Sequence, residues 1–254
     1  MKISNKVLLL LLAGSVTLSS CKKDEEEPEP TPAPTPAAPS NPIPAPSSAF
    51  GALVAIQTAN YVTVPFLGEI NQPIGLGVAV FGNLVSPGYV DGGTVTLNGS
   101  ALTKQSNSSY VYTPSATNAT GIDLGDESHW VVSGNSTTTV PALDLMTPRS
   151  MPTGPKYSGS TTIPINAEFT LSSSVTIADA DSIYYSVIGN GATVQKVVAG
   201  NIQSVTFTAA EMTTLTAGGG YVQIAPYNIS AQTVGGKQFY LVNESVTTKQ
   251  VTFN

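Results

Sequence analysis

The sequence predicts an all-β protein in which two tandem β-sandwich domains follow a disordered, Pro-rich tether. Only 10% of the 254 residues are charged, whereas Thr, Ser, Gly, Val and Asn are abundant, a composition typical of β-structure. Apolar or alternating segments recur about every ten residues between turns that contain Gly, Pro or Asn. A stretch that contains Pro and Gly at residues 146–159 interrupts this pattern, as linkers do. We therefore expect one sandwich at residues 49–150 and a second at residues 151–254.

Residues 1–20 have the features of a secretory signal peptide. Two lysines precede a short apolar run at residues 7–12, which is far shorter than the ~20 residues needed to span a bilayer. Leu18-Ser19-Ser20-Cys21 resembles the lipobox of bacterial lipoproteins, and Cys21 is the only cysteine. The resemblance implies cleavage before Cys21, acylation at this residue and attachment to outer-membrane lipid. The alternative is an ordinary secretory signal with a chance cysteine after the cut.

The residues after Cys21 predict a surface location. Lys22-Lys23-Asp24-Glu25-Glu26-Glu27 resembles the export tag of surface lipoproteins in Bacteroidetes-type bacteria, which implies display on the outer face of the outer membrane. The alternatives are an anchor that faces the periplasm and a simple solvated charge run. Residues 28–48 are mostly Pro, Ala, Thr and Ser, so residues 21–48 are predicted to form the tether, with a reach of roughly 80 Å.

The strands expected in the first half alternate or are continuously apolar. They lie at residues 74–81, 93–99, 109–112 and 129–132. In the last of these, His129 shares a face with Val131, opposite Trp130 and Val132.

The second half contains more local signals. Asn190-Gly191 predicts a hairpin turn, and Thr208-Ala209-Ala210-Glu211 matches a capping box that starts one or two helical turns. A long alternating strand closes the chain at residues 239–253. The other strands are expected at residues 161–165, 168–177, 182–188, 193–198, 204–207 and 221–225.

This order of strands with one helical crossover fits an immunoglobulin-like sandwich, and Tyr221 resembles the tyrosine corner of such domains. The layout resembles two-domain lipoproteins of Bacteroidetes-type genomes. The similarity covers most of residues 50–254 and lies in Gly93–Gly99, Trp130–Gly134 and a predicted turn at Tyr227-Asn228. It implies fold and location, and it implies no activity.

The sequence predicts no catalysis, no metal and no cofactor. A single histidine, His129, cannot supply a zinc site. Acidic groups at residues 123–127 and 179–181 leave calcium open as an alternative to polar turns. A glycoside hydrolase with an unmarked pair of carboxylates is a second alternative. The net charge of −6 argues against nucleic acid.

Aromatic residues are the candidates for ligand binding, because sugar sites stack rings on sugar faces. The candidates are Trp130, Tyr184, Tyr185 and Tyr227, each of which could instead be a core or cross-strand residue. Asp181-Ser182-Ile183 resembles an O-glycosylation signal of Bacteroidetes exported proteins, which implies modification of Ser182 if that residue is exposed.

We expect a lipid-anchored cell-surface protein that binds an extracellular glycan or polymer, or another surface protein. The alternative is an adhesin, surface-layer part or fimbria-like subunit whose long final strand adds to another sheet.

Overall fold

The computed structural model describes residues 49–84 and 88–254. Nearly all regular structure in these residues is β, which confirms the predicted all-β class. The predicted signal peptide, the lipid-attachment residue Cys21 and the tether lie outside the described residues.

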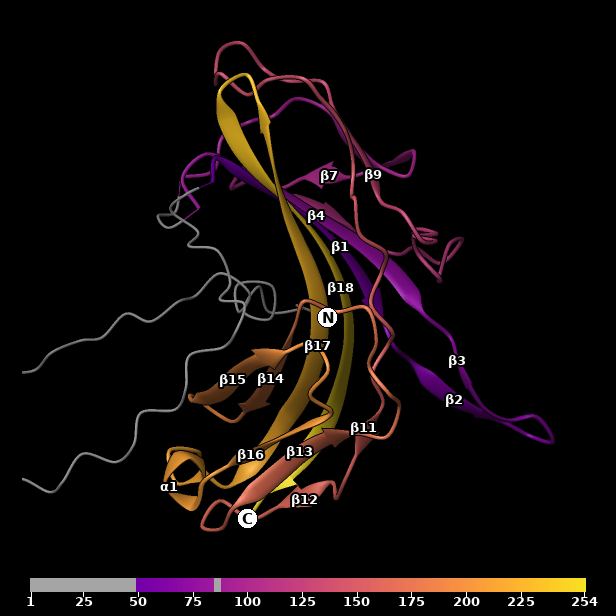
Figure 1. The fold of residues 1–254 in the computed structure, drawn as a ribbon, viewed down its shortest axis with the longest axis vertical. Helices are drawn as coiled ribbons and strands as arrows, with labels where there is room; N and C mark the ends of the chain where they lie inside the picture. Colours follow the sequence, from indigo (N-terminus) through magenta and orange to yellow (C-terminus); the bar gives the residue numbers. More distant parts are fainter. Residues whose placement is uncertain (1–48, 85–87) are drawn as a thin grey trace, which may run out of the picture. The chain divides into compact units, whose positions relative to one another are not determined.

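One nine-stranded sheet forms the framework (Figure 1). Its path runs β15-β14-β17-β18-β1-β4-β8-β7, and β12 pairs with β18 beside β1. The strands are β1 (Gly51–Thr58), β4 (Ile74–Phe81), β7 (Thr103–Lys104), β8 (Tyr110–Tyr112), β12 (Thr162–Ile163), β14 (Ser182–Ile188), β15 (Thr193–Ala199), β17 (Gly218–Val234) and β18 (Lys237–Phe253).

Three smaller sheets accompany the large one. A four-stranded sheet has the order β10-β9-β5-β6, with β5 (Val95–Leu97), β6 (Ser100–Ala101), β9 (His129–Val132) and β10 (Leu143–Met146). A three-stranded sheet has the order β11-β13-β16, with β11 (Tyr157–Ser158), β13 (Phe169–Ser173) and β16 (Ser204–Phe207). The hairpin of β2 (Tyr61–Val64) and β3 (Gly68–Asn71) stands alone as a two-stranded sheet.

Two cores lie on one face of the large sheet, which we call the inner face. The first core packs Leu53 and Phe239 of the large sheet with Trp130 of the four-stranded sheet. The second core packs Tyr185 and Phe253 with residues of the three-stranded sheet and of the single helix, α1 (Ala209–Met212). Each core is therefore a β-sandwich that shares the large sheet as one of its layers.

The predicted division into two domains at residues 150 and 151 is not confirmed. Strands β1 and β4 come from the first half of the chain, and they belong to the same sheet as β14, β17 and β18 from the second half. The final strand, β18, pairs with β1 in parallel and with β17 antiparallel, so it lies inside the sheet. Residues 239–244 and 252–253 of this strand are therefore paired on both sides and offer no free edge for the predicted addition to another sheet.

Two local sequence signals in the second half form the elements that they predicted. Thr208 Oγ1 accepts a hydrogen bond from the amide of Glu211, and the Glu211 carboxylate accepts one from the amide of Thr208, so the capping box is confirmed. Asn190-Gly191 connects β14 to β15, and Gly191 takes the positive φ of 85° that this hairpin turn requires.

The segment between the halves crosses the inner face between the two cores. Asn228 Nδ2 donates to the carbonyl oxygens of Ser150 and Asp179, and Ser245 Oγ donates to the carbonyl of Pro152. Arg149 forms an ion pair with Asp181. Tyr227-Asn228 lies within β17, so the predicted turn at these residues is wrong. The Asn228 side chain binds the backbone of the crossing segment and does not form a turn.

Candidate functional site

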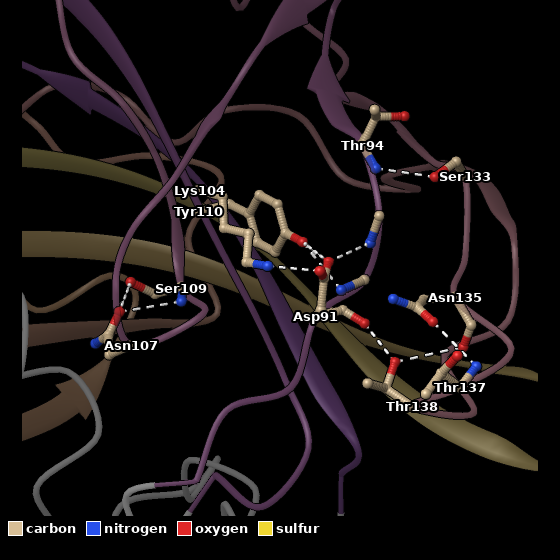
Figure 2. A network of polar contacts seen from close by, with 12 residues as sticks. Asp91, Thr94, Lys104, Asn107, Ser109, Tyr110, Ser133, Asn135, Thr137 and Thr138 are labelled. Atoms are coloured by element: carbon tan, nitrogen blue, oxygen red, sulfur yellow. Dashed lines mark hydrogen bonds and ion pairs between the residues drawn. The ribbon is translucent and has the colours of Figure 1, made fainter.

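A dense polar network surrounds Asp91 (Figure 2). Its carboxylate accepts hydrogen bonds from Lys104 Nζ, from Tyr110 Oη at 2.6 Å and from the amide of Gly93 at 2.8 Å. The hydrogen bond from Lys104, followed by that from Tyr110, holds the pKa of the Asp91 carboxyl well below its usual range. The Tyr110 oxygen also accepts a hydrogen bond from the amide of Gly92.

Each of these groups is satisfied by a protein partner. Thr138 Oγ1 also donates to the carbonyl of Asp91, which links the loop before β5 to the loop between β9 and β10. The network therefore fixes loops around the first core and leaves little capacity for a ligand.

The outer face of the large sheet, opposite the two cores, carries a second group of polar and aromatic side chains. We call it the tyrosine–glutamate face. Because side chains alternate along a strand, its members leave β14, β17 and β18 on the same side. Tyr227 lies directly opposite Ser182 on β14 and opposite Glu244 on β18. Its members are Tyr184, Ser186, Tyr221, Tyr227, Tyr240 and Glu244.

An apolar cluster surrounds these residues. It includes Ile56, Val78, Ala225 and Val246 together with Tyr184 and Tyr227. Each member that the structure describes in this cluster comes from the large sheet, whereas the two cores draw on two layers. The described part of the chain therefore provides one wall of this cluster and no opposing layer.

Three buried polar atoms on this face, Ser186 Oγ, Tyr227 Oη and Glu244 Oε2, make no hydrogen bond of good geometry. Ser186 nevertheless lies within reach of the Tyr184 hydroxyl, and Ser182 within reach of the Tyr227 hydroxyl, so only Glu244 Oε2 has no neighbour of this kind. Tyr184 Oη differs, because it donates to Gln195 Oε1 at 2.6 Å. Buried polar groups are normally paired, so the unpaired Glu244 Oε2 is the atom of this face that could accept an additional partner.

Glu244 makes the electrostatics of the face unusual. Its side chain is 3% exposed, and burial raises the pKa of its carboxyl to about 8. Burial also raises the pKa of Tyr227 to about 12. Near pH 7 the carboxyl is therefore mostly protonated, and the face offers neutral donors and acceptors within an apolar surround.

The structure divides the aromatic residues that the sequence singled out. Tyr184 and Tyr227 lie together on the tyrosine–glutamate face, where they too are buried, at 5% and 4% exposure. Trp130 and Tyr185 are 0% exposed in the two separate cores, so neither can stack on a ligand at the surface. The alternation of β14 explains why Tyr185 points to the core and Tyr184 to the opposite face.

Two other predicted sites also change. Ser182 is 1% exposed within β14, so it does not meet the exposure that O-glycosylation requires. Tyr221 is 47% exposed at the edge of the tyrosine–glutamate face, so it is not the buried tyrosine corner that its position suggested.

Sequence analysis missed Glu244 and the role of Tyr221. An acidic residue in an alternating strand normally indicates a solvated side, and nothing local marks Glu244 as buried. The only usable signal was alternation along the final strand, which places Glu244 on the same side as Tyr240, Val242 and Val246.

The single histidine lies beside an aspartate on the four-stranded sheet. His129 Nε2 lies 2.6 Å from Asp144 Oδ1 on the exposed side of β9. Within residues 49–84 and 88–254, His, Asp and Glu side chains form no group of three or more that could hold a metal ion.

Comparisons with protein-family models and with curated proteins give no match to this chain. In the described residues no helix has the length and apolar character to cross a membrane.

The Asp91 network predicts a clear difference between two substitutions. Asp91→Asn removes the charged acceptor of three hydrogen bonds and should lower the free energy of unfolding by about 2 kcal/mol. Lys104→Met removes only an exposed ion pair and should cost less than about 1 kcal/mol. Urea unfolding at pH 7 measures both changes, and equal stability of Asp91→Asn and the wild type would contradict this role.

Glu244 predicts an inverse pH dependence of stability. Its folded pKa of about 8 lies above the unfolded value of 4.5, so the folded state holds the extra proton between these values. The contribution of Glu244 to the free energy of unfolding is therefore complete below the unfolded pKa. It is lost as the pH rises toward 8, by about 1.4 kcal/mol per pH unit. Glu244→Gln should flatten this slope in urea unfolding at pH 5, 6.5 and 8, whereas the exposed control Glu127→Gln should retain it. Parallel slopes for Glu244→Gln and the wild type would refute the raised pKa of the buried Glu244 carboxyl.

Proposed function

We propose that this protein binds a neutral, hydroxyl-rich ligand, of the glycan or polymer class, on the tyrosine–glutamate face without catalysis. The observation that carries the proposal is the unpaired Glu244 Oε2, which shares one apolar face with the hydroxyls of Ser186 and Tyr227. Hydroxyls of a ligand would satisfy these atoms, and the surrounding apolar side chains would pack on the C–H face of a sugar ring.

The charge state of the face favours a neutral ligand. A mostly protonated Glu244 both donates and accepts hydrogen bonds, as the hydroxyls of Tyr227 and Ser186 do. A cationic ligand would instead draw the Glu244 carboxyl into its ionised form, and an anionic ligand would find no positive partner among these members of the face. Tyr221, half exposed, provides an accessible ring farther along β17 on the same side of the sheet.

We place this binding protein on the outer face of the outer membrane, held by acyl chains at Cys21. The support is the lipobox-like Leu18-Ser19-Ser20-Cys21 and the following Lys- and Glu-rich residues. Several acyl chains make an anchor stable, whereas one chain binds only marginally.

The alternatives have less support. A glycoside hydrolase needs two free carboxylates on opposite sides of a cleft. Asp181 and Glu244 are the two carboxyl groups whose charges act on Tyr227. Asp181 is not free, because it forms an ion pair with Arg149. In an assembly role, β15 would be the strand that pairs with another chain. It is an edge strand of the large sheet, because it pairs there with β14 alone.

Binding should depend on the hydroxyls of this face. In the full chain with Cys21→Ser, which is free of lipid, Tyr227→Phe and Ser186→Ala should each weaken binding to a glycan array about tenfold, since each removes one hydrogen bond to the ligand. Tyr157→Phe, which removes a hydroxyl from the three-stranded sheet, is the matched control and should bind as the parent does.

Two results would overturn the glycan proposal. Binding that survives both substitutions would move the ligand away from the tyrosine–glutamate face. The absence of any glycan bound by the parent chain would remove the ligand class itself.

The lipid anchor has a separate test. Cys21→Ser in the native cell should leave the protein unprocessed or release it from the outer membrane, because the acylated thiol is lost. Fractionation and immunoblotting measure this, with Ser20→Ala as the control that keeps a small residue before the cysteine. Outer-membrane retention of the Cys21→Ser protein would exclude acylation as the anchor.

A further inference from the structure

The hairpin of β2 and β3 ends in an exposed apolar tip. Phe66 is 107% exposed and Leu67 is 74% exposed, the two largest values among the exposed large apolar residues. Phe66 has a φ of 68°, in the left-handed region that bulky residues rarely adopt. Pro65 and Gly68 flank the pair, so the tip carries no charge. Figure 1 shows this hairpin projecting beyond the neighbouring strands.

The rest of the chain braces this hairpin. Tyr61 Oη donates to the carbonyl of Gly154 at 3.1 Å. Lys156 forms an ion pair with Glu69 and lies over the Tyr61 ring, 5.4 Å from its centroid. An isolated two-stranded hairpin is at best marginally stable, so these contacts hold Phe66 and Leu67 in a defined position away from the cores.

We propose that Phe66 and Leu67 insert into the lipid surface of the membrane that carries the protein. The inference rests on the lipid anchor of the proposed function and is independent of glycan binding. Two side chains present on the order of 300 Å² of apolar surface. A specific protein interface needs roughly 800 Å² per partner, so the tip is too small to hold a protein partner by itself. A lipid surface requires no matching shape and accepts two apolar side chains.

The length of chain before residue 49 makes this contact geometrically accessible. The path from Ala49 to Phe66 has 17 residue steps and spans at most about 56 Å in extended strands. The 27 residues between Cys21 and Ala49 can extend to roughly 80 Å. A tethered tip has a high effective concentration at its own membrane, so a contact that is weak in solution becomes populated.

Tryptophan quenching tests the insertion. Residues 22–254 with an N-terminal hexahistidine are held on neutral phosphatidylcholine vesicles that contain a nickel-chelating lipid, with or without brominated acyl chains. Phe66→Trp reports on the tip, and Ile202→Trp, at an exposed turn elsewhere, is the matched control. Trp130 is fully buried and supplies the same background in both proteins. We expect brominated lipid to quench the added tryptophan at least twofold more in Phe66→Trp than in Ile202→Trp.

Equal quenching in the two proteins would overturn the inference. The nickel-chelating lipid replaces the native acyl chains, so this result is independent of modification at Cys21. Flotation of the natively processed protein with vesicles tests the acyl anchor separately. Flotation without selective quenching would support the acyl anchor and contradict insertion of Phe66 and Leu67. Selective quenching without flotation would support insertion and contradict the acyl anchor.

Discussion

The pairing of β18 is the constraint on which the rest of the structure depends. This strand of 17 residues pairs with β17 along one side and with β1 and β12 along the other. The Gly235-Gly236 turn, in which both residues have positive φ, lets β17 and β18 form one long hairpin. Because this hairpin passes through both halves, each sandwich is built on the same two strands.

The inner face of β18 explains why there are two cores. Phe239 and Leu241 belong to the first core, and Val251 and Phe253 belong to the second. Between them the inward side chains become polar, and those at Asn243 and Ser245 bind the backbone of the segment that crosses between the sandwiches. The inward side chains of β18 are thus apolar at both ends and polar in the middle. This order determines where the two cores and the crossing segment lie on the sheet.

The outer face of the same strand has a different character. Tyr240, Glu244 and Val246 are buried there, although none of the described members of their apolar cluster lies outside the large sheet. Burying the charged form of a carboxyl is costly, and the raised pKa of Glu244 reflects that cost. The sheet therefore has one face completed by two smaller sheets and one that buries Glu244 Oε2 without a hydrogen bond.

The sequence predicts those parts of the fold that local chemistry determines. The bounds of β4, the hairpin at Asn190-Gly191 and the capping box at Thr208 all follow from neighbouring residues. The parallel pairing of β1 with β18 joins segments nearly 190 residues apart, and no local pattern specifies it. The candidate site was only half predictable for the same reason. Alternation separates Tyr184 from Tyr185, but which of them faces a core depends on which smaller sheet covers β14.

Position in the framework also distinguishes the Asp91 network from the tyrosine–glutamate face. Both contain a carboxyl and a tyrosine hydroxyl, yet Asp91 is paired and has a lowered pKa, whereas Glu244 has a raised one. The difference arises because loops can fold their amides and a lysine around Asp91. Glu244 lies at the centre of a sheet whose backbone amides are already used in the ladder. A partner for Glu244 Oε2 must therefore approach from above the sheet, because the backbone amides beside it are already paired.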